Sequence, residues 1–252
     1  MKKLFIFVVA LVLLCSTLVS CDTPYLILYK ADAALEEAPY VMTVKMSFES
    51  DNKDMNDLFS AMNIEIPITV DGKNIGIDMN MDMMGYTANA KVTVVDMVMY
   101  YDMEILGQNI KMKATMDKDQ YQDFLNENNT KPMINTESLG KLTIESKNGK
   151  KYIICDEIGD DGIKALNDMV EKSLQPLGAS AAIDDILYQV TISNDKYEAM
   201  DMTCTYFITA AGETCTATLR MSTEFSYDNV AKITAPADAD NYQETSFENL
   251  MS

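Results

Sequence analysis

Most of the chain alternates apolar and polar residues with a period of two, and this pattern constrains the fold more than any other feature. In "YVMTVKMSF" (residues 40–48), Met42, Val44, Met46 and Phe48 fall on one face of an extended chain. The residues between them are mostly polar and fall on the other face. Such alternation is typical of a half-buried β-strand. Similar stretches recur between residues 64 and 226, so the sequence predicts an α+β protein that is mainly β.

Turn residues join these stretches into an antiparallel meander. Residues 71–74 (DGKN) and 147–150 (KNGK) are typical of tight β-hairpin turns, and a third hairpin turn is expected at residues 210–213. By contrast, residues 91–101 (KVTVVDMVMYY) are interpreted as one strand that changes register near Val94 and Val95, as at a bulge. Pro67 suggests that the strand at residues 64–70 lies at an edge or a bulge.

Two segments are predicted as helices. Residues 25–38 lie between Pro24 and Pro39, and Leu26, Tyr29 and Ala33 mark the expected apolar side. Residues 161–177 repeat apolar residues at helical spacing. Residues 117–129 are expected to form a short helix or a polar excursion, and the polar C-terminal residues are expected to be loose.

Methionines continue the inward row of the predicted strands. In "IDMNMDMMGY" (residues 77–86) they alternate with Asp78, Asn80 and Asp82, on the same face as the preceding isoleucines. The last strand likewise places Met221 inward. Ten methionines are predicted to line an apolar cavity: Met42, Met46, Met79, Met81, Met83, Met97, Met99, Met112, Met200 and Met202.

Three interpretations of these methionines remain open. The Met-x-Met pairs suit Cu(I), a soft ion, but the chain has no histidine to complete such a site. Methionine also fills ordinary cores, and it is over-used on adaptable binding surfaces because its side chain repacks easily. We therefore predict no metal site and weigh a solid core against a deformable wall. Acidic pairs such as Asp160-Asp161 lack the spacing of a calcium loop.

The N-terminus is typical of a secreted, lipidated protein. Lys2 and Lys3 precede the apolar run from residue 4 to residue 14, which is too short to span a bilayer and has the form of a signal peptide. The following Leu18-Val19-Ser20-Cys21 resembles the lipobox of bacterial lipoproteins. The resemblance implies cleavage after Ser20 and a diacylglyceryl group on Cys21. The expected location is the extracytoplasmic face of the cell membrane, held by an acyl anchor.

Composition excludes several classes of function. Removing residues 1–20 removes two lysines, so 18 basic residues face 39 acidic ones and the mature net charge is −21. Such a chain repels nucleic acid and anionic membrane surfaces. Without histidine the usual general base near neutral pH is missing, and the acidic residues alternate onto the solvent side. We predict no enzyme activity, no catalytic residue and no cofactor.

Three cysteines remain in the folded part. Cys204 and Cys215 flank the predicted turn at residues 210–213 and share one face, but out of direct register. A disulfide between them would need a shift of the strands. The pairing of these cysteines stays open, and buried thiols are the simpler interpretation.

The order of elements resembles that of the bacterial lipoproteins with the LolA/LppX-type fold, including uncharacterised Gram-positive members. A helix after the lipid cysteine, a meander that begins with "YVMTVKMSF", a second helix in mid-chain and a last strand ending "YDNVAKITAPADA" carry this resemblance. It implies a strongly curved antiparallel sheet, an unclosed barrel, that wraps about two helices around an apolar cavity. In characterised relatives that cavity carries lipids or acyl chains.

This organisation divides the chain into a signal peptide (residues 1–20), a lipidated linker (21–23), one domain (24–242) and a loose tail (243–252). The domain is either a single unit or two helix-plus-meander halves, 24–135 and 136–242. We expect a membrane-anchored protein that binds or carries a lipid or another hydrophobic ligand. The alternative is a cell-surface interaction protein with a solid core and no small ligand.

Overall fold

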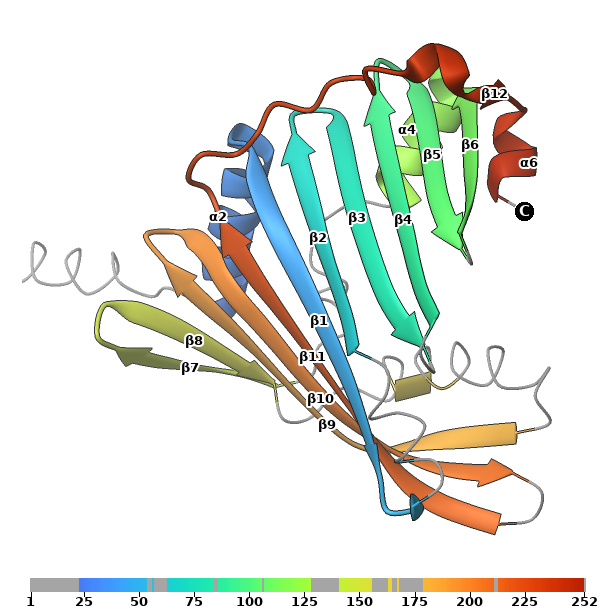
Figure 1. Ribbon diagram of the computed structural model, residues 1–252. Helices are drawn as coiled ribbons and strands as arrows, with labels where there is room; N and C mark the ends of the chain where they lie inside the picture. The colour runs from blue at the N-terminus through green and yellow to red at the C-terminus, as the bar shows by residue number, and fades with distance from the viewer. Residues whose placement is uncertain are drawn as a thin grey trace, which may run out of the picture.

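One large β-sheet carries the strands of the computed structural model (Figure 1). The structure describes residues 23–53, 56, 63–83, 86–105, 107–127, 141–155, 163, 164, 167, 179–210 and 213–251. Within them, twelve strands follow the order β12-β6-β5-β4-β3-β2-β1-β11-β10-β9-β8-β7. The strands are β1 (Tyr40–Ser50), β2 (Asn63–Asp71), β3 (Asn74–Met83), β4 (Tyr86–Val95), β5 (Val98–Ile105), β6 (Gln108–Thr115), β7 (Leu142–Lys147), β8 (Lys150–Cys155), β9 (Ala179–Ser193), β10 (Lys196–Ala210), β11 (Glu213–Ser226) and β12 (Gln243–Glu244). The helices are α2 (Pro24–Glu37), α4 (Lys118–Glu127), α6 (Phe247–Met251) and the 3₁₀ helix η2 (Ala239–Asn241).

Two meanders, β1–β6 and β7–β11, meet in the middle of this sheet. They are joined by the antiparallel pairing of β1 with β11, which runs from Val41 opposite Ser226 to Ser50 opposite Ala217. Within each meander, neighbouring strands follow one another along the chain, and β12 adds to β6 in parallel. The mainly β fold with a few short helices is therefore confirmed.

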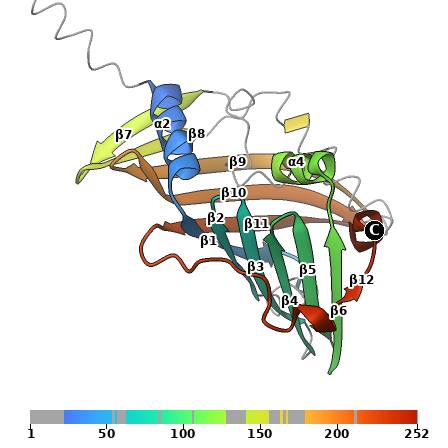
Figure 2. The ribbon, with the colours of Figure 1, turned by 90° about the horizontal axis from the view of Figure 1, so that it is seen from above.

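The expectation of a strongly curved sheet, an unclosed barrel, is wrong. The sheet is mixed and is neither strongly curled nor closed, and β12 and β7 form its two edges (Figures 1 and 2). Bulges are a usual means of bending a sheet. Among the described strand pairs, register shifts occur between β9 and β10, near Tyr197 and Thr205. Elsewhere the long strands keep their register, so the sheet twists but does not close into a barrel.

The hairpin turns at residues 71–74 and 147–150 are confirmed, but a further turn was missed. Residues 91–101 are not one bulged strand, because the chain reverses at Asp96 and Met97 between β4 and β5. Both residues have positive φ, 50° and 64°, as a type I′ hairpin turn requires. The turn lacks glycine and asparagine, the residues that usually announce it. Pro67 does not mark an edge either, since β2 lies between β1 and β3.

Helix α2 forms almost where it was predicted. Thr23 is its N-cap, and its side-chain oxygen accepts a hydrogen bond from the backbone N–H of Leu26 at 3.2 Å. Pro24 occupies the first turn, where its missing N–H costs nothing. The expected apolar side was wrong, however: Leu26 and Tyr29 are exposed, and a different face is buried. The buried residues are Ile27, Leu28, Ala31 and Leu35.

The second predicted helix, residues 161–177, lies largely outside the described residues. Ile163, Lys164 and Asn167 are helical. Ile163 packs against the buried residues around α2. The side-chain oxygen of Asn167 accepts a hydrogen bond from the N–H of Ile183 at 2.9 Å, which ties this segment to β9.

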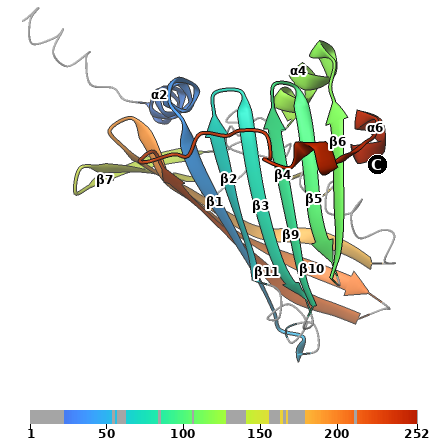
Figure 3. The same cartoon turned by 45° about the horizontal axis from the view of Figure 1, so that its top comes forward.

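The C-terminal residues, expected to be loose, form a strap across the polar face of the sheet (Figure 3). We use "strap" for residues 227–246. A side-chain carbon of Ile233 lies 3.8 Å from the position that a Cβ on Gly76 would take, so the strap lies close over β3 there. Farther along, Tyr242 is buried and stacks edge-on against Tyr100, with ring centres 5.4 Å apart. Beyond β12, α6 turns back, and Phe247 meets Phe124 of α4.

Candidate binding face

Strand register gathers the inward side chains into one apolar face. Met46 of β1 lies opposite Met221 of β11, which in turn lies opposite Met202 of β10. On either side, Met46 pairs with Ile64 of β2 and Met202 pairs with Tyr188 of β9. We call Ile64, Met46, Met221 and Met202 the methionine row. Its members come from four neighbouring strands and lie at the middle of the sheet.

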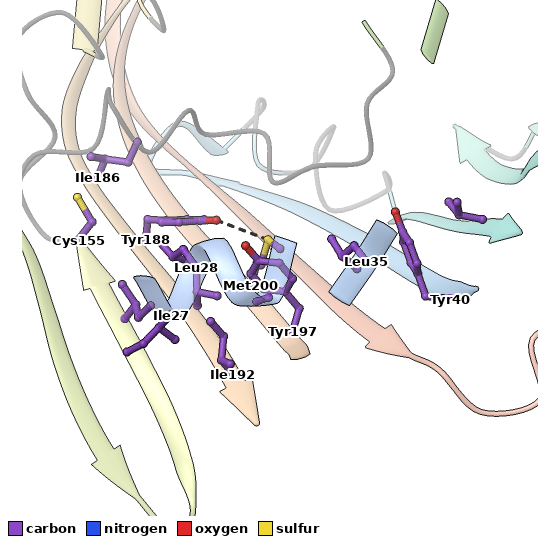
Figure 4. Close-up of a cluster of buried hydrophobic side chains, with 14 of the residues drawn as sticks. Ile27, Leu28, Leu35, Tyr40, Cys155, Ile186, Tyr188, Ile192, Tyr197 and Met200 are labelled. Carbon is purple, nitrogen blue, oxygen red and sulfur yellow. Dashed lines mark hydrogen bonds between the residues drawn. The ribbon is translucent and has the colours of Figure 1, made fainter. Parts of the chain in front are cut away.

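One end of this face is covered by α2. Ile27, Leu28 and Leu35 of the helix pack with buried residues of β8, β9 and β10 (Figure 4). There the Tyr188 hydroxyl donates a hydrogen bond to the sulfur of Met200 at 3.5 Å. Burial raises the pKa of Tyr188, so its hydroxyl stays protonated as a donor. This end is a filled core.

The other end of the face is covered by α4 and α6. Tyr121 and Phe124 of α4 pack with Ile75, Val94 and Met99 of β3, β4 and β5. Tyr121 also donates a hydrogen bond to the backbone oxygen of Lys73 at 2.6 Å, which fixes the helix over the β2–β3 turn. Phe247 and Leu250 of α6 complete the cover. This end is a second filled core.

At the middle of the sheet, the apolar side chains of this face are only half buried. The four members of the methionine row all keep part of their surface exposed, whereas the side chains under the helices are buried. Neighbouring inward residues on β1, β2, β3 and β11 are equally half buried: Val44, Phe48, Ile66, Met79 and Leu219. Partly exposed apolar side chains from neighbouring strands are thus grouped on this face, and grouped apolar side chains of this kind are where hydrophobic ligands and partners bind.

The ten predicted cavity-lining methionines separate into distinct environments. Met42, Met46, Met79, Met112 and Met202 are half buried on the apolar face. Met99 and Met200 are buried in the two cores, so they pack rather than line an open surface. Met81 and Met83 belong to β3, but their side chains lie outside the described residues, as does Cys21.

Met97 does not line the face. It sits in the β4–β5 turn with 40% of its surface exposed. Alternation does not predict the position of Met97, because Asp96 and Met97 form a two-residue turn with positive φ at which the chain reverses. The same turn separates Met97 from Met99, so this Met-x-Met pair does not share one strand face as the copper interpretation required.

Met221 is not among the ten methionines predicted to line a cavity, although its inward direction was predicted. It stands alone in its strand, with no second methionine two residues away. Only the register of β11 between β1 and β10 brings it between Met46 and Met202. The alternation of "TCTATLRMSTEF" (residues 214–225) predicts the inward direction of Met221. The Met-x-Met pattern does not include this residue.

The polar face carries charges that fasten the strap. The Lys111 ammonium lies 2.6 Å from an Asp238 carboxylate oxygen of the strap and 3.2 Å from one of Asp102 of β5. These two carboxylates raise the pKa of Lys111, and the lysine lowers the pKa of Asp238. A shallow, open hollow of about 530 Å³ lies beside them, lined by Asn109, Ile110, Lys111, Asn241 and Gln243. Its charges already pair with one another, so we assign it a structural role.

Within the described ranges, the cysteines form no disulfide and the acidic residues form no metal-binding group. Cys204 lies opposite Leu219, and Cys215 lies opposite Ile208, so the two thiols do not face each other across the hairpin. Among the residues that the structure describes, no group of three or more His, Cys, Asp or Glu side chains is placed to hold a metal ion.

Comparison with known families identifies the chain by its sequence. A model of the family of unknown function DUF6612 matches residues 27–244, from α2 to β12. The chain belongs to this family. No curated protein matches the sequence. The matched range contains the sheet, the methionine row and all but the last two residues of the strap, so these are parts of the DUF6612 domain. In the described part of this DUF6612 protein, no helix combines the length and apolar character needed to cross a membrane.

Proposed function

We propose that this DUF6612 protein is a lipid-anchored, extracytoplasmic protein that binds a lipid or another hydrophobic molecule over the methionine row. One observation carries the proposal: half-buried methionines from neighbouring strands lie side by side at the middle of the sheet, next to the core under α2, against which Met202 packs. The lipobox-like sequence before Cys21 supports the anchor. A large sheet with helices on its apolar face supports the likeness to LolA/LppX-type lipoproteins.

The binding mechanism is passive. An acyl chain laid over the row removes apolar surface from water, which is worth about 0.8 kcal/mol per buried CH₂ group. Methionine side chains have several rotatable bonds and a polarizable sulfur, so they reshape around chains of different form. Beta-branched residues would hold a fixed shape instead. The row therefore suits a class of apolar ligands rather than a single one.

Native mass spectrometry with organic extraction tests the ligand. The chain from Asp22 onward, incubated with membrane lipids, should carry an adduct of discrete, lipid-sized mass. Replacing Met46 and Met221 together by glutamine keeps their length but adds polar groups to the row, and should remove the adduct. Met97→Gln makes the same chemical change in the exposed turn and should leave the adduct in place.

A clean apo mass after incubation, with intact folding by circular dichroism, would overturn ligand binding. That result would favour the alternative, an interaction protein with a methionine-packed core. Equal loss of the adduct in the Met97→Gln control would also overturn the assignment, since it would separate binding from the row. The anchor is tested separately, by the mass of the N-terminal peptide of the membrane-extracted protein.

A further inference from the structure

Helix α2 has a second apolar surface, which faces away from the sheet. Tyr25, Leu26 and Tyr29 are 51%, 43% and 71% exposed. They recur at helical spacing on the side opposite the buried residues of α2. The outer face of an amphipathic helix is normally polar. Three large exposed apolar side chains within five residues therefore form a patch, which we call the α2 patch.

The position of the patch in the chain indicates what covers it. Thr23 caps the helix, and only one residue separates Thr23 from Cys21. An extended chain spans at most about 3.6 Å per residue, so the Cα atoms of Cys21 and Thr23 are within about 7 Å of each other. A diacylglyceryl group on Cys21 would hold the first turn of α2 at the lipid headgroups.

The chemistry of the patch fits that location. Tyrosine is enriched at membrane–water interfaces, where its ring lies among apolar atoms and its hydroxyl reaches water. The exposed acidic residues of α2, Glu36 and Glu37, lie at the other end of the helix. The 14-residue helix is about 21 Å long at about 1.5 Å per residue, so these carboxylates are held away from the anchor.

We propose that the α2 patch docks into the headgroup region of the bilayer next to the anchor. The inference rests on the proposed lipidation of Cys21. Because the opposite side of α2 packs on the apolar face of the sheet, this docking sets the α2-covered end of that face beside the membrane. The net charge opposes anionic lipid, so the contact is apolar and does not depend on basic residues.

The absence of tryptophan from the sequence gives a clean optical test. Tyr29→Trp places one reporter in the patch. Phe207→Trp is the matched control, because Phe207 is also exposed but lies far from α2. It lies on β10 ten residues beyond Tyr197, which belongs to the core under α2, and so about 33 Å farther along the strand. Each mature lipoprotein is reconstituted into phosphatidylcholine vesicles and floated on a density gradient, with ordinary or acyl-brominated lipid.

The tryptophan at position 29 should emit at shorter wavelength on vesicles and lose most of its emission in brominated lipid, while the one at position 207 should change little. Adding Tyr25→Ser and Leu26→Ser to Tyr29→Trp should reduce the quenching. Floated protein with equal quenching at both positions would overturn the docking and leave the anchor standing. Failure to float would overturn the anchor and the docking together, and neither result bears on the ligand adduct, which the mass-spectrometry experiment tests separately.

Discussion

At the scale of single residues, one amino-acid type has three roles here. Met99 and Met200 are buried fillers under the helices, Met46, Met202 and Met221 belong to the half-buried methionine row, and Met97 lies exposed in the β4–β5 turn. Sequence alternation assigns a methionine to a face correctly inside a strand. It does not reveal whether a helix covers that position, because the covering residues are remote in the chain.

Tyr197 shows the same limit for a polar contact. Its hydroxyl donates a hydrogen bond to a carboxylate oxygen of Asp32 at 2.7 Å and so fastens α2 to β10. The ring is fully buried. Burial, and next the hydrogen bond to Asp32, raises the pKa of Tyr197. Nothing in the local sequence of either residue announces this pair, which joins segments far apart in the chain.

We expect Tyr197→Phe to lower the free energy of unfolding at neutral pH by about 1–3 kcal/mol, because Asp32 loses its donor. In the wild type, the unfolded chain releases the tyrosine proton near pH 10, while the folded chain holds it to higher pH. Stability should therefore fall above about pH 10, by up to about 1.4 kcal/mol per pH unit for this group. Denaturant titrations from pH 7 to pH 11 measure both effects.

Tyr197→Phe should make the decline above pH 10 shallower. Tyr29→Phe is the control, since Tyr29 is largely exposed, and it should leave both neutral stability and the alkaline slope near those of the wild type. An unchanged slope in Tyr197→Phe would contradict the assignment of the alkaline decline to this buried hydroxyl.

At the scale of elements, two hairpin turns that contain glycine were predicted correctly, and one turn without glycine was missed. Residues 71–74 and 147–150 contain glycine or Asn-Gly, and both hairpins were predicted because those residues tolerate positive φ. The β4–β5 turn uses Asp96 and Met97 instead. Its strain is compensated by the pairing of β4 with β5, which no local rule detects. One strand was therefore predicted where two exist.

Replacing Met97 by glycine should stabilise the protein. A non-glycine residue at positive φ costs about 1 kcal/mol, and glycine adopts this conformation freely. We expect Met97→Gly to raise the free energy of unfolding by about 1 kcal/mol in denaturant titrations and to leave any ligand adduct unchanged. Met99→Ala, two residues away but buried, should instead cost about 2–5 kcal/mol. Destabilisation by Met97→Gly would contradict the turn.

The C-terminal segment is held on the rest of the protein by a small number of side-chain contacts. Its composition is polar, which predicted a loose tail. Yet Tyr242 packs on Tyr100 and Asp238 pairs with Lys111 in the strap, and Phe247 and Leu250 of α6 pack against the core under α4. These contacts are spaced too irregularly to give a period in the sequence. Their partners lie on β5 and β6 for the strap and on α4 for α6, so these contacts form only in the folded molecule.

At the scale of the whole molecule, the sheet joins two cores. Val190 is fully buried in the core under α2, and Val94 is fully buried in the core under α4 and α6. Partly buried Ile68 packs against both cores. The backbone hydrogen bonds between β1 and β11 join the two meanders into one continuous sheet. We expect them to unfold together, in one transition, rather than as separate halves.

The matched substitutions Val94→Ala and Val190→Ala test this cooperativity. Each removes the same two methyl groups from a fully buried site and should cost roughly 2 kcal/mol. In each variant, probes in both halves should report the same midpoint of unfolding, and the two variants should lower this midpoint by a similar amount relative to the wild type. Hydrogen exchange of amides in β5 and β9 provides these probes. A midpoint that moves in one half only would show independent halves.

The sequence by itself determined most of the strands and of their turns, the limits of α2 to within a residue, and the face of each described methionine that lies inside a strand. These follow from contacts between residues close in the chain, where side-chain period and φ preferences act directly. The tertiary structure decided the pairing of β1 with β11, the openness of the sheet, the strap, and the row that sets Met221 between Met46 and Met202. Those features depend on which distant segments meet, because register between strands remote in sequence is fixed by packing of the complete sheet and not by any local pattern.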